Sequence, residues 1–161
     1  MPSKFVFPGG AVDAGDTAIG HLSPACTARL GLRSDGPSAA AIAGAALREL
    51  TEETGLHLRA GAPLRFVFRA ITPPGRSRRF DARFLLADAT DLLGDAGDFS
   101  AADQELGHLQ WVPLPHARAL DLPFITEVVL AEVAAIARGE HQPGVPFFDN
   151  SGDIPTFRRL D

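Results

Sequence analysis

Three glutamates and an arginine lie close together in residues 48–56, Arg-Glu-Leu-Thr-Glu-Glu-Thr-Gly-Leu. In a helix, successive residues are about 100° apart, so Glu49, Glu52 and Glu53 share an arc of roughly 100°. Carboxylates at this spacing repel one another, and a divalent cation removes the repulsion. Mg²⁺ and Mn²⁺ prefer such oxygen ligands. The pattern indicates metal-assisted chemistry, with a solvated salt-bridge surface as the alternative.

The preceding residues must bring a glycine loop to this helix. A strand-like run at 4–7 ends at Pro8-Gly9-Gly10, which predicts a strand that leads into a loop. Residues 17–37 contain Gly and Pro without periodicity, so we expect an irregular segment with a short helical turn near 25–30. Ser38 is a suitable N-cap for a helix over 39–53. Gly55 is placed to end that helix in the left-handed conformation.

The remaining chain alternates apolar runs with proline-rich or acidic connections. Residues 64–71 and 80–87 read as two strands of a hairpin, joined by a basic connection. Residues 89–103 are acidic and read as a loop that contains a short turn. A further strand is expected at 109–112, and an amphipathic helix at 123–138. Residues 140–161 form a C-terminal tail rich in proline and glycine.

Composition favours one ordinary soluble domain. The chain has 161 residues, 45% of them hydrophobic and 22% charged, which is enough for one buried core. A formal net charge of −5 has the wrong sign for a protein that binds nucleic acid in bulk. The lone Cys26 offers no internal disulfide, and no apolar run is long enough to span a membrane. Together with the missing signal peptide, this predicts a cytoplasmic protein without membrane contact.

These motifs resemble the signature of the Nudix hydrolases. That signature is a glycine, five residues, a glutamate, seven residues, and then Arg-Glu-hydrophobic-any-Glu-Glu-any-Gly-hydrophobic. Residues 48–56 match its second half fully. Gly10, five residues and then Asp16 match its first half, with aspartate in place of glutamate. An insertion, residues 17–40, separates the halves.

The split signature is similar to that of the peroxisomal coenzyme A diphosphatases. Their Thr-Pro and Arg-Arg-aromatic-Asp segments resemble Thr72-Pro73-Pro74 and Arg78-Arg79-Phe80-Asp81, followed here by Arg83-Phe84. The resemblance implies an α/β fold. The implied fold is a Nudix-type α/β/α sandwich with a mixed β-sheet, and residues 1–161 are expected to form it as a single domain. Only nine residues precede Gly10, so the sheet is expected to lack one or more N-terminal strands. Either a longer natural chain or a homodimer would then cover its edge.

The resemblance also implies roles for individual residues. Glu52 and Glu53 would ligate the metal, and Glu49 would be a further ligand or the general base. Gly10 would offer its carbonyl to the metal, and Arg48 would orient a glutamate.

Other candidates each carry an alternative. Asp16 is either a site residue or a loop-capping aspartate. Glu105, or else Asp103, would supply an additional carboxylate from a loop before the strand that bears Trp111, or would be an ordinary solvated acid. Arg78, Arg79 and Arg83 would bind the anionic substrate. The alternative is that they are charged residues that keep the tip of the hairpin soluble.

The expected function is hydrolysis of a diphosphate linkage in a nucleoside diphosphate derivative, with Mg²⁺ or Mn²⁺ as cofactor. Coenzyme A or acyl-CoA is the favoured substrate, and ADP-ribose, NADH and nucleoside triphosphates are alternatives. A catalytically silent nucleotide-binding module is a second hypothesis. A third is an interaction domain that uses the apolar stripe of Val128, Val129 and Val133.

Overall fold

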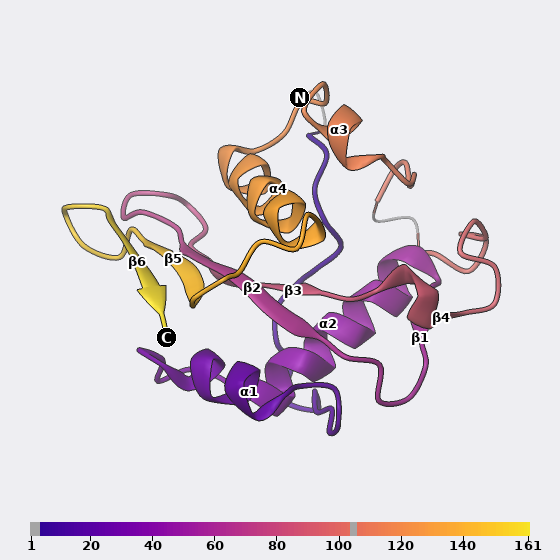
Figure 1. The fold of residues 1–161 in the computed structure, drawn as a ribbon, viewed down its shortest axis with the longest axis horizontal. Coiled ribbons are helices and arrows are strands. Elements are labelled where there is room, and N and C mark those ends of the chain that lie inside the picture. Colours follow the sequence, from indigo (N-terminus) through magenta and orange to yellow (C-terminus); the bar gives the residue numbers. More distant parts are fainter. Residues whose placement is uncertain (1–3, 104–105) are drawn as a thin grey trace. The chain divides into compact units, whose positions relative to one another are not determined.

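The computed structural model describes residues 4–103 and 106–161 and shows an α/β fold with a mixed sheet (Figure 1). The chain divides into two compact units. The first, here called the sheet unit, comprises the described residues up to Val6 together with Phe66–Leu86 and Leu114–Asp161. The second, the glutamate unit, comprises the described residues of Phe7–Arg65 and Ala87–Pro113. The expected fold class is confirmed.

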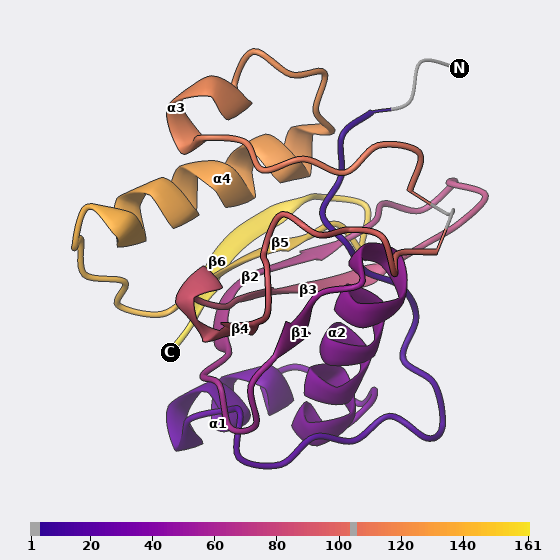
Figure 2. The same cartoon turned by 90° about the vertical axis from the view of Figure 1, so that its right-hand side faces the viewer.

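The sheet unit contains a four-stranded sheet in the order β3-β2-β5-β6 (Figures 1 and 2). The strands are β2 (Arg65–Ile71), β3 (Asp81–Leu86), β5 (Val145–Asp149) and β6 (Thr156–Leu160). β2 pairs with β5 in parallel, and β5 pairs with β6 in antiparallel fashion, so the sheet is mixed. Five consecutive residues of β2 are buried, which suits an inner strand. The predicted pair of strands, 64–71 and 80–87, is thus confirmed.

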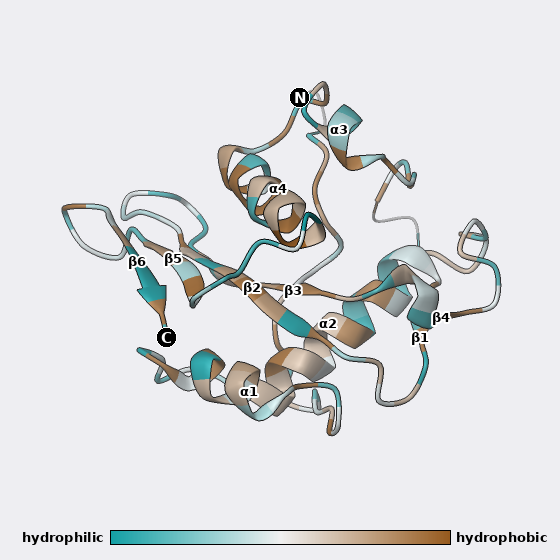
Figure 3. Cartoon of the chain, viewed as in Figure 1, coloured by the Kyte–Doolittle hydropathy of each residue, from teal (hydrophilic) through white to brown (hydrophobic). Residues whose placement is uncertain are grey.

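Helix α4 (Phe124–Ala137) covers one face of this sheet (Figure 2). Val129 forms a buried cluster with Phe68 and Ala70 of β2, and Val128 and Val133 pack against that cluster. The apolar colouring of α4 and β2 in Figure 3 follows this packing. Packing within the unit's own core accounts for this stripe, so its apolar character does not by itself indicate a partner surface. No helix among the described residues is long and apolar enough to cross a membrane.

The glutamate unit is built around helices α1 (Pro24–Gly31) and α2 (Ala39–Thr54), which pack together. The Ser38 hydroxyl accepts from the Ala41 N–H at 3.2 Å, and Gly55 ends α2 with a left-handed φ of 73°. Both predicted ends of this helix are confirmed. A small antiparallel pair, β1 (His57–Leu58) with β4 (Leu92–Leu93), and the short 3₁₀ helix η1 (Ala89–Asp91) complete the regular elements.

Residues 17–40 fold back onto α2 instead of extending away from it. The Ala18 N–H donates to the Ala40 carbonyl at 3.0 Å, and the Leu64 N–H donates to the His21 carbonyl at 2.7 Å. Thr17 lies so close to Gly44 of α2 that a Cβ at residue 44 would overlap with the backbone of Thr17. The insertion therefore closes as a loop whose two ends meet on α2.

Three expectations of local structure are wrong. Residues 4–7 are not a strand, and the Phe5 N–H instead donates to the Asp121 carbonyl at 3.1 Å. Residues 109–112 are also irregular, and the Trp111 indole donates to the Ala96 carbonyl at 2.7 Å. Both segments are apolar, but neither pairs with a strand among the described residues. Conversely, the tail at 140–161 contains β5 and β6, which its proline and glycine content concealed.

Replacement of Gly44 with alanine tests the packing of the insertion on α2. The added methyl group must displace backbone at Thr17, so we expect a loss of about 1–3 kcal/mol in the free energy of unfolding. Chemical denaturation of both proteins measures it. Gly31→Ala is the matched control, because Gly31 lies in α1 with open space around it and alanine favours helix. Equal stability of Gly44→Ala and wild type would contradict the close contact.

Candidate active site

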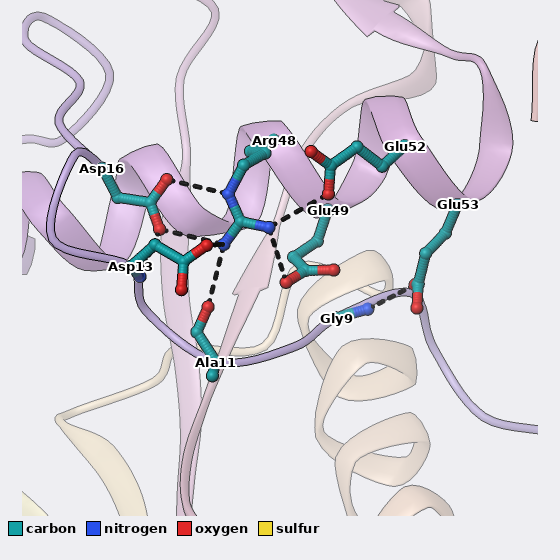
Figure 4. A network of polar contacts seen from close by, with 8 residues as sticks. All are labelled: Gly9, Ala11, Asp13, Asp16, Arg48, Glu49, Glu52 and Glu53. Atoms are coloured by element: carbon teal, nitrogen blue, oxygen red, sulfur yellow. Dashed lines mark hydrogen bonds and ion pairs between the residues drawn. The ribbon is translucent and has the colours of Figure 1, made fainter. Parts of the chain in front are cut away.

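Arg48 is the centre of a polar network on α2 (Figure 4). Its Nε and Nη2 donate to the two carboxylate oxygens of Asp16, both at 2.9 Å. Its Nη1 donates to Glu49 at 2.8 Å and to Glu52 at 3.0 Å. Nη2 also donates to the Ala11 carbonyl at 2.8 Å. One guanidinium thus joins the loop before the insertion to two of the three helix glutamates.

Asp16 occupies the position where the resemblance expected a glutamate. Its side chain is 7% exposed, and the loop itself compensates for the shorter reach. The Asp13 N–H donates to the Asp16 carboxylate at 2.7 Å, and the Asp16 N–H donates to the Asp13 carbonyl at 3.0 Å. This tight turn carries Asp16 to the guanidinium of Arg48, and the exposed Asp13 carboxylate lies 3.7 Å from the same group. Asp16 therefore makes a bidentate ion pair as well as shaping its own loop.

The glycine loop lies against the other glutamates of α2. The Gly9 N–H donates to Glu53 at 2.7 Å, and Glu53 is only 6% exposed. At Gly10 a Cβ would overlap with the Glu49 carboxylate, so a larger residue there would displace the end of the Glu49 side chain. The loop thus fixes Glu53 by a hydrogen bond and leaves room for Glu49. Figure 4 shows both side chains directed toward it.

The network changes the titration of the two residues at its centre. The hydrogen bonds from Arg48 hold the pKa of the Asp16 carboxyl below its usual value of 3.8, and the Asp13 N–H adds to this effect. In turn, the hydrogen bonds to Asp16 and then Glu49 raise the pKa of Arg48. Each partner stabilises the charged form of the other.

The carboxylate oxygens of the three helix glutamates are ligands of the type that a hard divalent cation prefers. Glu49, Glu52 and Glu53 present carboxylates on one helix beside the glycine loop, and the missing Cβ at Gly10 creates the space at Glu49. In the described part of the chain, no three acidic, histidine or cysteine side chains yet converge on a common point. Glu49 and Glu52 are directed instead toward Arg48, which takes the place of a cation as their counter-charge.

The other predicted acids lie in the segment that follows η1 and β4. The Asp103 N–H donates to the Glu52 carbonyl at 2.8 Å, so this segment passes the C-terminal end of α2. The backbone of Asp103 is therefore hydrogen-bonded to the backbone of Glu52, one of the predicted metal ligands. Glu105 lies outside the described residues.

The predicted substrate arginines all belong to the sheet unit. Arg78 is exposed on the connection between β2 and β3, and the Arg79 Nε donates to the Thr72 carbonyl at 3.4 Å. Arg83 is different, because its side chain is 6% exposed and pairs with Asp81 at 3.0 Å. A role at a solvated hairpin tip is therefore excluded for Arg83.

Sequence reasoning missed several contacts that define the network. The Gly9 N–H and the Ala11 carbonyl act through the backbone, which leaves no side-chain signal in the sequence. Asp13 was visible as an acid three residues before Asp16, a spacing typical of a tight turn. Arg69, an arginine inside the apolar run of β2, was also visible and is buried.

Comparison with known proteins gives one positive result. The family model for the NUDIX domain matches residues 37–133, which is more than half of the chain. The match begins just before α2 and leaves out the glycine loop and most of the insertion. No curated protein and no solved structure matches.

A comparison of wild type with Asp16→Asn across pH tests the ion pair. Because the pKa of the Asp16 carboxyl is lowered in the folded state, its contribution to stability is fully present above the usual pKa of 3.8, which applies to the unfolded chain. This contribution is lost as the pH falls through the pKa that Asp16 has in the folded protein. We expect the difference in melting temperature to be largest near neutral pH and to vanish in strong acid. Asp13→Asn, in the same loop but exposed, should change stability little at any pH. A constant difference for Asp16→Asn across pH would contradict the assignment.

Proposed function

This chain belongs to the Nudix family and is a pyrophosphohydrolase that acts on diphosphate linkages, and we propose that it does so with a divalent metal and the three glutamates of α2. The observation that carries the proposal is the Arg48 network. It joins Asp16 to Glu49 and Glu52, and the glycine loop contacts the remaining glutamate. A catalytically silent nucleotide-binding module could hold its loop in the same way, and the hydrolysis experiments below distinguish it from an enzyme.

In this proposal each network residue has a distinct task. Glu52 and Glu53 bind the metal, and Glu49 is either a further ligand or the base that takes a proton from the attacking water. The Gly10 carbonyl is an additional ligand. Arg48 touches no substrate and holds Glu49 and Glu52 in place, while Asp16 holds Arg48. The carboxylate of Glu53 has several acceptor positions, so a bond from Gly9 is compatible with a ligand role.

A bound Mg²⁺ or Mn²⁺ would supply positive charge to the diphosphate oxygens and make water more acidic. The protein's own contribution is positional. The bond from Gly9 restricts Glu53, and the contact with Gly10 restricts Glu49. Because the side chains of Glu49 and Glu53 are already restricted before substrate binds, the reaction does not have to bear the entropy cost of ordering them.

Coenzyme A or acyl-CoA is the proposed substrate. The support is the resemblance of the split signature and of the Arg78-Arg79-Phe80-Asp81 segment to coenzyme A diphosphatases. The structure adds that the insertion is an ordered part of the glutamate unit, because α1 packs against α2 and Cys26 and Leu30 are buried. The predicted homodimer and the predicted cytoplasmic location stay predictions.

Replacement of Glu53 with glutamine tests the role of the helix carboxylates. Glutamine keeps the size and one acceptor oxygen but removes the charge that balances a cation. We expect hydrolysis to fall by at least about a hundredfold while nucleotide binding is retained. Glu140→Gln is the matched control, because the Glu140 side chain is exposed and its carboxylate pairs with the exposed Arg138. Full activity of Glu53→Gln would refute the proposed metal ligand.

A hydrolysis screen tests substrate and metal together. Coenzyme A, acyl-CoA, ADP-ribose, NADH and nucleoside triphosphates are each supplied with Mg²⁺ or Mn²⁺, and mononucleotide and phosphate products are measured. We expect release of a mononucleotide from coenzyme A or acyl-CoA, its loss in EDTA, and its return on addition of either metal. Hydrolysis of only another compound would reject the substrate, and hydrolysis that persists in EDTA would reject the metal.

A further inference from the structure

The Asp13 carboxylate lies beside the Arg48 guanidinium but is too far away for a hydrogen bond (Figure 4). Its oxygen is 3.7 Å from Nη2 of Arg48, whereas an N–H···O hydrogen bond is roughly 2.7–3.2 Å long. The Asp13 side chain is 71% exposed, and that of Asp16 is 7% exposed. The two aspartates of one turn approach the same guanidinium in different ways, and the role of the outer one requires an explanation.

The hydrogen-bond donors of the Arg48 guanidinium are already in use. An arginine side chain carries five N–H groups. In this network their acceptors are both carboxylate oxygens of Asp16 and one oxygen each of Ala11, Glu49 and Glu52. Asp13 therefore adds negative charge at this group without forming one of those five bonds.

The backbone of Asp13 is fixed beside Arg48, whereas its carboxylate lies in an exposed position. The Asp13 N–H donates to the Asp16 carboxylate at 2.7 Å, and the Asp13 carbonyl accepts from the Asp16 N–H at 3.0 Å. Both bonds use main-chain groups of Asp13, so they do not restrict the rotation of its side chain. A shift of roughly 0.5 Å would bring the carboxylate within hydrogen-bond distance of Arg48.

The charge balance of the network changes when a cation enters it. In the structure Arg48 is the counter-charge of Glu49 and Glu52, at 2.8 and 3.0 Å. A divalent cation bound by the same glutamates would repel the guanidinium, because two positive groups at short range disfavour each other. Arg48 then needs negative charge on the side away from these glutamates. Figure 4 shows Asp13 and Asp16 on that side.

We propose that Asp13 is a positioning residue for the metal site, and that its carboxylate restrains Arg48 on the loop side when a cation shares Glu49 and Glu52. Arg48 then continues to orient both glutamates while the cation is bound. Asp13 is one of the five unspecified residues between Gly10 and Asp16, so this role comes from the particular turn of this chain. The inference rests on the proposed function, because it takes the cation and its ligands from there.

Binding of Mn²⁺ in the absence of substrate tests this role, because it measures the site and not the reaction. Calorimetric titration gives the affinity of wild type, and Glu53→Gln identifies the binding that belongs to the proposed site. We expect Asp13→Asn to weaken that binding by about three- to fivefold, the upper part of the range for an exposed ion pair. Asp13→Glu keeps the charge and should recover most of the affinity. Equal affinity of Asp13→Asn and wild type would overturn the proposal.

Asp35→Asn is the matched control for the loss of charge. Asp35 is exposed in the insertion of the same unit and lies outside the Arg48 network, so we expect its replacement to leave Mn²⁺ affinity unchanged. In EDTA, Asp13→Asn and wild type should melt at the same temperature, which a purely structural role would not explain together with weaker Mn²⁺ binding. Equal losses of affinity in Asp13→Asn and Asp35→Asn would contradict the proposal, because net charge alone would then account for both.

An Arg48→Gln background separates action through Arg48 from direct action on the cation. Without the guanidinium there is no group for Asp13 to restrain, so we expect Asp13→Asn to have no further effect on Mn²⁺ affinity in that background. The same loss in both backgrounds would show that Asp13 acts on the cation itself, and the positioning role would be rejected. If Arg48→Gln does not fold, Asp13→Asn in the otherwise unchanged protein decides the question alone.

These measurements keep the two proposals distinct. Mn²⁺ binding that is the same in wild type and Glu53→Gln would end the metal role in the proposed function, and the role of Asp13 with it. Mn²⁺ binding that is lost in Glu53→Gln but equal in wild type and Asp13→Asn would end only the role of Asp13.

Discussion

The guanidinium of Arg48 joins two segments that the insertion separates. Its bidentate pair with Asp16 is the contact that brings the loop before the insertion to α2. The carbonyl of Ala11 and the carboxylates of Glu49 and Glu52 complete the set of acceptors. Without this cation, neighbouring carboxylates would repel one another and the loop would have no charged anchor. The position of the glycine loop, and with it the geometry at Glu49 and Glu53, depends on this group.

The insertion is tolerated because its ends return to the same helix. Thr17 contacts Gly44, and the Ala18 N–H binds the Ala40 carbonyl. A loop that closes on itself adds little entropy cost per residue, so its length matters less than where its ends lie. The two halves of the signature therefore meet in space although they are far apart in the chain. The turn between Asp13 and Asp16 makes up for the shorter aspartate side chain.

Charge is distributed unevenly between the two units. Glu49, Glu52 and Glu53 belong to the glutamate unit, and the buried arginines Arg69 of β2 and Arg83 of β3 belong to the sheet unit. Both buried guanidinium groups pair with the Asp81 carboxylate, which offsets part of the cost of removing their charge from water. Their environment also explains why Arg83 differs from Arg78 and Arg79, which share its charge but remain near the surface.

By itself, the sequence determined the local elements and the chemistry. Alanine-rich composition, Ser38 and Gly55 specify α2 through propensity and capping, and helical periodicity places its glutamates on one face. Such effects act within a few residues, so they can be read from the chain. Tertiary structure decided the contacts between distant residues. The pairing of β5 with β2, the loss of strand at 4–7 and 109–112, and the meeting of Asp16 with Arg48 all depend on partners far along the chain. Side-chain types alone do not name those partners, because hydrogen bonds and ion pairs are selected by which segments the folded backbone brings together.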